Sequence, residues 1–422
     1  MNKKVIILGC GVSGLVAAEK LLDTKKFDVI LLEKADHLGG LAASFEMENE
    51  QIPKFYHHIV RSNKTTIKYL TQFGAMENAK WKRVKIAILK DGKTYELTKP
   101  WEFLSIKGVS LYAKIRFALF GLYVIFKKNC PTIPPDMNAQ EWLYKYCGKE
   151  ATDFFWWNLY GRNKFNIPLS KIAAAQFAQR LWEKEGYDLF TFPPKGLDVM
   201  IKGFADELKE KSGKIITNAN ITHLDVKKKE IVVNGKKEKY DILINTIPVP
   251  EFIKFAKGLS TSYIKRIEKL RYCPGVGLCF ATEEFLLPNV YWLNLFGERI
   301  HVLMQHSVLI DKYKHKVSWC IRYGGSEEDL ALSNEEIIRE YTAVIKKYFP
   351  KVNFKWIKVF KEKYAEPVYD KDYATYAPDY KTPVEDLYNA GIQVTFPKIR
   401  NQNVALESGE KVAEIIKEKY LK

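Results

Sequence analysis

The sequence predicts an α/β protein, in which a discontinuous Rossmann-like domain is interrupted by an inserted mixed α+β domain. Three observations predict this class. A strand, glycine turn, helix and second strand open the chain within residues 5–33. Strands and an amphipathic helix suited to the same sheet recur near residues 195–250, and a last strand and helix follow residue 385. Two aromatic-rich insertions separate these pieces.

The first element is an apolar run at residues 5–8, too short for a helix, which predicts a strand buried on both faces. Gly9, Gly11 and Gly14 follow in a GxGxxG pattern, with apolar residues at helical spacing after them. In such a turn the first glycine permits the bend, the second admits a pyrophosphate, and the third lets helix and strand pack closely. We therefore expect a dinucleotide whose pyrophosphate meets the positive N-terminus of the helix.

A second buried strand at residues 29–32 ends at Glu33, nineteen residues past Gly14 (33 − 14). A carboxylate there accepts hydrogen bonds from ribose hydroxyls and repels a 2′-phosphate, which disfavours NADP. A second glycine pair, Gly39 and Gly40, is not needed by an NAD-binding dehydrogenase. It suits FAD, a longer dinucleotide that runs past this loop, although an ordinary surface turn would also explain the pair.

The later elements continue the same sheet. An amphipathic helix is predicted over about residues 198–211, and the dipeptide Asn234-Gly235 is a strong hairpin signal. Further strands are predicted at residues 214–216, 221–226, 230–233 and 240–246, and the chain closes with a strand near 386–391 and a helix at about 403–419. We assign residues 1–60, 195–250 and 385–422 to the nucleotide domain. Residues 61–194 and 251–384, with aromatic helices at 142–157 and 172–182, form the predicted substrate domain.

Motifs along the whole chain occur in the order of one flavoprotein superfamily. They are the glycine pattern at 9–14, Glu33, the pair at 39–40, Pro-Lys-Gly at 194–196, the strand end at 245–248 and the closing motifs at 389–391 and 407–409. The chain resembles the amine oxidase, protoporphyrinogen oxidase and phytoene desaturase branch of the FAD-dependent oxidoreductases. The resemblance implies a glutathione-reductase-like FAD-binding domain.

The resemblance also implies which residues hold FAD. Ser13 and the backbone after Gly11 would cradle the pyrophosphate, and Glu33, with Lys34 beside it, would meet the adenosine ribose. The remaining positions that it assigns to the cofactor are Gly39, Gly40 and Leu41 along the flavin chain, Ile221 at the adenine, and Gly391, Asn403 and Val404 near the pyrophosphate and isoalloxazine. One departure is Ile392, where the family has an acid, and the polar residues within 397–403 could compensate.

Two adjacent histidines, His57 and His58, are the candidate catalytic residues. In relatives their segment runs beneath the isoalloxazine, and UDP-galactopyranose mutases have a similar stretch. Neighbouring side chains on a strand face opposite ways, so at most one should point at the flavin, as an acid, a base or a ligand for a substrate oxygen. A structural role is equally open. No metal site is expected, because no ligand spacing recurs.

Residues that could line the substrate side are His301, His306 and Arg322, although ordinary sheet positions explain them better. A mutase would need arginines and tyrosines paired on a diphosphate. The arginines available for that are Arg162, Arg180, Arg322 and Arg400.

Composition limits the partners. The 67 Lys and Arg against 50 Asp and Glu give +17 (67 − 50), but the lysines are spread along the chain, which does not favour nucleic acid. Six cysteines without a CxxC pair predict reduced thiols and a cytoplasmic protein. The apolar stretch before Cys10 is shorter than the roughly 7 residues of an export signal. The longest uncharged apolar run, residues 117–126, is too short to span a bilayer.

Residues 114–128 combine that apolar run with basic flanks. The block could lie in a membrane interface, or form a buried helix of the substrate domain. Attraction to anionic lipids also remains open. The sequence therefore predicts an FAD-dependent oxidoreductase that oxidises or desaturates a C–C or C–N bond of an apolar or cyclic small molecule. A flavin-dependent sugar-nucleotide mutase and a non-catalytic flavoprotein subunit are the alternatives, and the oligomeric state is unknown.

Overall fold

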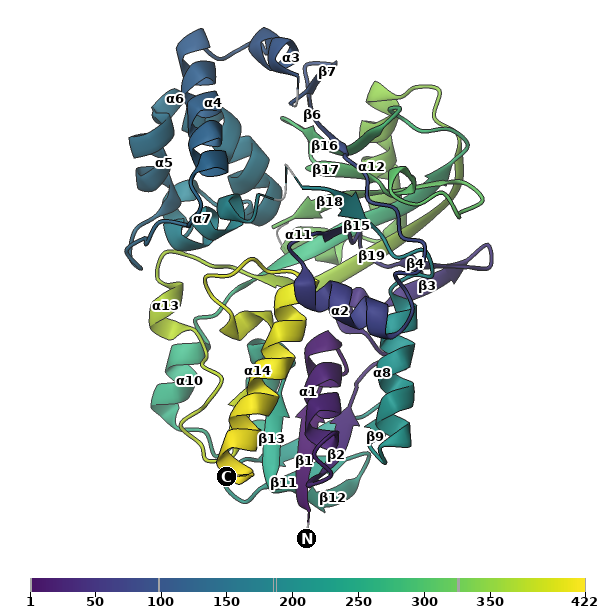
Figure 1. Ribbon diagram of the computed structural model, residues 1–422, viewed down its shortest axis with the longest axis vertical. Helices are drawn as coiled ribbons and strands as arrows, with labels where there is room; N and C mark the ends of the chain where they lie inside the picture. Colours follow the sequence, from purple (N-terminus) through teal and green to yellow (C-terminus); the bar gives the residue numbers. More distant parts are fainter. Residues whose placement is uncertain (1, 98, 185, 187, 325–326, 422) are drawn as a thin grey trace.

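A computed structural model describes residues 2–97, 99–184, 186, 188–324 and 327–421. A five-stranded parallel sheet is assembled from three distant parts of the chain (Figure 1). Its order is β20 (Leu387–Asn389), β13 (Ile242–Asn245), β1 (Lys3–Leu8), β2 (Phe27–Leu32) and β9 (Lys214–Ile216). The predicted α/β class with a discontinuous Rossmann-like sheet is confirmed.

Helices cover one face of this sheet and a small second sheet covers the other. The helices are α1 (Val12–Leu22), α8 (Asp198–Glu210) and α14 (Gln402–Tyr420), which lie side by side in Figure 1. The small sheet has the order β12 (Lys236–Lys239), β11 (Glu230–Val233), β10 (Ile221–Asp225) and β14 (Ala256–Lys257), and α9 (Val249–Phe255) packs beside it. With both faces covered, the apolar run of β1 is fully buried, as predicted.

The predicted hairpin forms between β11 and β12. Asn234 and Gly235 connect the strands, and Val233 pairs with Lys236 across them. Both turn residues have positive φ, 49° and 77°. This backbone twist matches that of the strands in a type I′ turn, which explains why the dipeptide is a reliable signal.

The second large unit is a seven-stranded sheet. Its order is β19 (Phe354–Pro367), β15 (Tyr272–Thr282), β18 (Lys316–Tyr323), β17 (Val302–Gln305), β16 (Val290–Leu295), β6 (Lys85–Lys90) and β7 (Lys93–Glu96). The helices α11 (Glu327–Ala331) and α12 (Asn334–Tyr348) lie near one face, where Ile337 and Tyr341 join a buried cluster. Residues of the opposite face, including Trp319, belong to the same buried cluster as Leu15 of α1. The two sheets therefore share one continuous core.

A group of helices completes the molecule, at the upper left of Figure 1. It contains α3 (Pro100–Ser105), α4 (Leu111–Phe126), α5 (Ala139–Cys147), α6 (Lys149–Ala151), the π-helix η2 (Thr152–Phe165) and α7 (Ala174–Trp182). The aromatic helix expected over residues 142–157 is interrupted, because Gly148 has φ 81° and ends α5. The chain then continues into η2, where Asn166 N donates to Gly161 O, five residues back.

Short elements connect these units. They are η1 (Gly40–Ala42), β3 (Ser44–Met47), β4 (Glu50–Pro53), β5 (Ile59–Val60), α2 (Lys64–Gln72), η3 (Leu169–Lys171), β8 (Phe190–Thr191), α10 (Thr261–Ile267), η5 (His306–Val308), α13 (Tyr373–Tyr376) and η6 (Ile392–Val394). The domain boundaries stay a prediction. Helix α2, beyond the boundary at residue 60, packs against α8 and α14.

The six cysteines form no disulfide, and five of them are buried. Among the described residues, no helix combines the length and the apolarity that a bilayer-spanning segment needs.

Candidate functional site

The glycine turn lies between the end of β1 and the start of α1. Gly9 has φ +97°, and a Cβ there would lie 2.8 Å from Thr246 Oγ1. A Cβ at Gly14 would lie 2.2 Å from the carbonyl oxygen of Gly9. The two outer glycines are therefore required by the protein's own packing.

The middle glycine is different. A Cβ built on Gly11 meets no atom of the described residues within 4 Å. Gly11 is also the N-cap of α1, and no side chain caps that helix end. Open space beside uncapped first-turn amides is the environment that binds a phosphate at a helix N-terminus, so these residues fit a pyrophosphate.

Glu33 lies against the same turn. Its Oε2 accepts a hydrogen bond from Cys10 N at 2.8 Å, and its Oε1 accepts one from Ala35 N at 2.9 Å. Each carboxylate oxygen keeps a lone pair for a ribose hydroxyl, so the predicted role fits. Burial, and secondarily the charge of Glu33, raise the pKa of the Cys10 thiol, which keeps it protonated. Lys34, next in the chain, is exposed.

Two further predicted segments meet this turn. Gly39 N donates to Cys10 O at 2.9 Å, and a Cβ on Gly40 would lie 3.4 Å from the Cα of Gly11. Leu41 is exposed beside them. On the other side, Ala219 N donates to Glu33 O at 2.8 Å, which holds the start of β10, and with it Ile221, near the same sheet edge.

The C-terminal segment reaches the turn through Gly391. A Cβ on Gly391 would lie 4.0 Å from Ser13 Oγ, and Gly391 N donates to Ser408 Oγ at 2.6 Å. The Ser13 hydroxyl donates to Ala405 O at 2.7 Å, so it joins α1 to α14 and only the Ser13 backbone remains for a phosphate.

Asn403 and Val404 start α14, as expected, but their polar groups have protein partners. Asn403 Oδ1 accepts from Thr66 N at 3.0 Å, and its Nδ2 donates to Glu407 Oε1 at 2.7 Å. Val404 N donates to the capping Asn401 Oδ1 at 3.0 Å. These two residues can line a cofactor, whereas their hydrogen bonds stabilise the helix start.

His57 and His58 lie in an irregular segment just before β5 and make different contacts. His57 Nδ1 lies 2.9 Å from Phe55 O. Burial, with a smaller effect from His58, lowers the pKa of His57 to about 4. His58 Nδ1 lies 3.0 Å from the Tyr291 hydroxyl, and its ring packs against Phe190. His57 is thus a neutral imidazole at pH 7.

The sequence reasoning missed the most unusual group, Lys164 on η2. Its side chain is buried, with 4% exposed, and its Nζ donates to the Tyr56 hydroxyl at 3.1 Å. The Nζ also lies 5.1 Å from the ring of Trp292 and 5.0 Å from that of Tyr323. Among the described residues, no carboxylate lies within ion-pair distance of it. We call Lys164, Tyr56, Trp292 and Tyr323 the aromatic cage.

Two contacts connect the aromatic cage to the histidine segment and to the start of α14. The Tyr56 ring stacks at 6.0 Å on His58, and Phe165, next to Lys164, packs 4.2 Å from the guanidinium of Arg400, one residue before the cap of α14. A lysine at the end of an aromatic-rich stretch, residues 154–165, was the available sequence signal.

The two histidines proposed for the substrate side, His301 and His306, are buried. His306 is fully buried, and burial, then the charges of His57 and His58, lower its pKa to about 3. Burial, then Arg162 and Arg322, lower the pKa of His301 to about 3.

The four arginines are also engaged. Arg322 pairs with Asp329 at 2.5 Å, and Arg400 pairs with Glu366 at 2.7 Å. Arg162 donates to a backbone carbonyl at 3.2 Å, and Arg180 lies over the ring of Tyr160. Each of the four therefore already has a partner within the protein.

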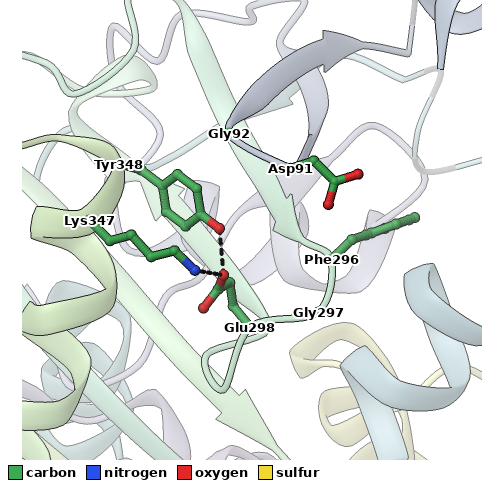
Figure 2. A pocket seen from close by; sticks show the side chains of 7 residues that line it. All are labelled: Asp91, Gly92, Phe296, Gly297, Glu298, Lys347 and Tyr348. Carbon is green, nitrogen blue, oxygen red and sulfur yellow. Dashed lines mark hydrogen bonds and ion pairs between the residues drawn. The ribbon is translucent and has the colours of Figure 1, made fainter. Parts of the chain in front are cut away.

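A pocket of about 560 Å³ lies elsewhere, at the turns that follow β6 and β16 (Figure 2). Figure 2 shows Lys347 and Tyr348 both directed at Glu298. Although burial opposes it, hydrogen bonds from these two residues lower the pKa of Glu298. The pocket is remote from the glycine turn (Figure 1) and its carboxylate is already engaged, so we assign it no chemistry.

Comparisons with known proteins agree with this geometry. The model of the flavin containing amine oxidoreductase family matches residues 12–417. No curated protein matches the chain in sequence. Among solved structures, a provisionally named protoporphyrinogen oxidase from Exiguobacterium sp. 255-15 is 14% identical with a TM-score of 0.80, covering 99% of both chains.

Two other structures are similar over their full length. Reduced UDP-galactopyranose mutase is 15% identical with a TM-score of 0.79, covering 100% of this chain and 97% of that one. Putrescine oxidase bound to putrescine is 15% identical with a TM-score of 0.72, covering 99% of each chain. At these identities the likeness shows a shared fold. The family model spans nearly the whole chain, and the protein therefore belongs to the flavin containing amine oxidoreductase family, as an FAD-dependent oxidoreductase.

Proposed function

We propose that the protein oxidises or desaturates a C–C or C–N bond of an apolar or cyclic small molecule. The observation that carries this proposal is the aromatic cage, a buried lysine surrounded by three aromatic rings next to the segment of His57 and His58. Aromatic walls favour an apolar substrate and exclude water from the reaction.

The residues proposed to hold FAD are grouped around the glycine turn. The backbone at Gly11 and the start of α1 suit the pyrophosphate, Glu33 suits the ribose, and the Gly39-Gly40 loop and Gly391 flank them. Bound FAD supplies a two-electron acceptor for a substrate hydride. The protein's own part is to orient the substrate and to accept or hold the accompanying proton.

His57 and His58 are the proposed proton-handling residues. The lowered pKa of His57 leaves its imidazole neutral at pH 7, which is the form that accepts a proton. Lys164 and the Tyr56 hydroxyl form a hydrogen-bonded pair that can orient a polar atom of the substrate.

The test is anaerobic reduction of the purified flavoprotein by fractions of a metabolite extract. We expect at least one fraction to bleach the visible flavin absorbance, and mass spectrometry to find its product two hydrogens lighter. A Lys164→Gln variant that retains flavin should be reduced at least about tenfold more slowly. Equal rates in the two proteins would contradict the role of the cage.

The mutase alternative is less well supported. Arg322 and Arg400 are committed to carboxylates, which leaves them unsuited to a substrate diphosphate. Turnover of a sugar nucleotide only after chemical reduction of the flavin would favour the mutase. A flavin that no fraction reduces, in a protein with no such turnover, would favour a non-catalytic subunit.

A further inference from the structure

A cluster of exposed apolar side chains covers α3 and α4. Of the eleven large apolar side chains exposed in the described part of the chain, eight lie on these two helices. Phe126 is 81% exposed and Trp101 is 68% exposed. Single exposed apolar residues are ordinary, but a contiguous group marks an interaction surface.

The six exposed apolar residues of α4 lie on one side of the helix. They are Leu111, Tyr112, Ile115, Leu119, Leu122 and Phe126. At about 100° per residue, these positions fall within an arc of about 100°. The opposite side, with Phe120 and Val124, is buried against the other helices. Helix α3 packs beside α4 through their buried sides, where Phe103 stacks on Phe117 at 5.6 Å, and it adds the exposed Trp101 and Leu104. We call this surface the α3–α4 face.

Basic residues border the α3–α4 face. Residues 99–128 contain six Lys or Arg and one Glu. Lys114 is turned inward, where its Nζ donates to Leu104 O at 2.6 Å, whereas Lys107, Lys127 and Lys128 are exposed. Figure 1 shows both helices at the end of the molecule opposite the termini.

We propose that the α3–α4 face docks in the interface of an anionic lipid bilayer, with α4 parallel to the membrane plane. The apolar arc would enter the acyl boundary, Trp101 and Tyr112 would lie at headgroup level, and the exposed lysines would bind lipid phosphates. A helix needs roughly 20 residues to cross a bilayer, and α4 has 16, so in this proposal it lies along the surface.

Charge favours the lipid over a second copy of the chain. A two-fold symmetric dimer through this face would place the same basic flanks against each other. The chain as a whole is also basic, at +17. An anionic bilayer satisfies both the apolar arc and the lysines. This inference does not depend on the proposed reaction, since it uses no residue of the cofactor site.

The test is co-flotation of the flavin-loaded protein with vesicles of phosphatidylcholine, with and without phosphatidylserine. We expect flotation with the anionic vesicles, weakened by high salt. Leu119→Asp with Phe126→Asp should lower the bound fraction at least about tenfold, because two apolar side chains that would insert into the bilayer are lost. Lys127→Gln with Lys128→Gln should weaken binding to anionic vesicles by about tenfold or more and leave neutral vesicles unaffected.

Matched controls keep this test decisive. Leu421→Asp changes an exposed leucine outside the face, and Lys236→Gln with Lys239→Gln removes two exposed lysines on β12. Both should float like the wild type. Flavin content and unfolding temperature check each variant, with Phe126→Ser as the milder substitute.

Three results would overturn the proposal. The first is a wild-type protein that floats with neither kind of vesicle. The second is that the variants of the α3–α4 face float as well as the wild type. The third is a dimer in sedimentation that the Asp substitutions dissociate without any vesicle binding, which would assign the face to a second copy.

Discussion

The glycine turn and the aromatic cage are built by opposite means. The turn consists of backbone amides, glycines and one carboxylate, all within residues 9–40. The cage uses side chains from Tyr56, Lys164, Trp292 and Tyr323, which are far apart in the chain. A backbone site of this kind fixes which cofactor binds, whereas a side-chain site can change with the substrate while the fold is kept.

Substitutions of the glycines test how the turn is built. Gly14→Ala places a Cβ 2.2 Å from Gly9 O, so helix and strand must separate. We expect the free energy of unfolding, measured in urea without FAD, to fall by about 3 kcal/mol or more. A folded Gly14→Ala protein of wild-type stability would contradict the packing role.

Gly11→Ala should separate binding from folding. Its Cβ meets no atom of the described part of the chain, so the stability of the apoprotein should stay within about 1 kcal/mol of the wild type. The methyl group would occupy the space for the pyrophosphate and weaken FAD by about 100-fold, or about 2.7 kcal/mol. Calorimetric titration of the apoprotein with FAD measures this change. Protein that purifies with full flavin content would show that the pyrophosphate does not lie there.

The contrast also explains how far the sequence could be interpreted. Gly9, Gly14, Glu33 and the Asn234-Gly235 hairpin act through local geometry, which spacing along the chain records. Lys164 acts through rings that the fold brings to it, and periodicity does not record such contacts.

The same distinction accounts for two other differences. The interruption of the aromatic helix depends on the positive φ of Gly148, and the Ser13 hydroxyl bonds to Ala405 across 392 residues. Exposure of the 114–128 block was equally hidden, since a core helix has the same composition.

Glu33→Ala removes the one side chain on which the turn depends. It should weaken FAD by about 2 kcal/mol, through lost hydrogen bonds to the ribose and a less ordered turn at Cys10. Glu33→Gln keeps the acceptor oxygen and should recover part of the loss. Calorimetric titration with FAD measures the loss, whereas riboflavin, which lacks both the adenosine ribose and the pyrophosphate, should bind the variant and the wild type alike. Equal FAD affinity in the Ala variant and the wild type would refute the assignment.

Lys164→Met tests the second half of the comparison. Removal of a buried lysine that has no carboxylate partner among the described residues should raise the free energy of unfolding by about 1 to 2 kcal/mol while flavin reduction slows. The matched control is Lys114→Met, which removes another buried lysine, on α4, outside the cage. Reduction rates should be unchanged in the control. If Lys164→Met is destabilising and reduces normally, the lysine is structural.

His306 lies near the His57-His58 segment, because its ring packs against Phe192 and Trp319 and its pKa is lowered by burial and then by the charges of His57 and His58. Its pKa falls from 6.5 to about 3 in the folded protein. Between these values the unfolded chain binds a proton that the folded chain does not, so the stabilisation is complete above pH 6.5 and is lost as the pH falls. At pH 5.5 the stability lost is about 1.4 kcal/mol.

His306→Phe should therefore show a smaller loss of unfolding free energy between pH 7 and 5.5, with His57 and His301 leaving a residual slope. Identical slopes in the two proteins would mean that the ring of His306 is open to water in the folded protein, which would contradict its burial.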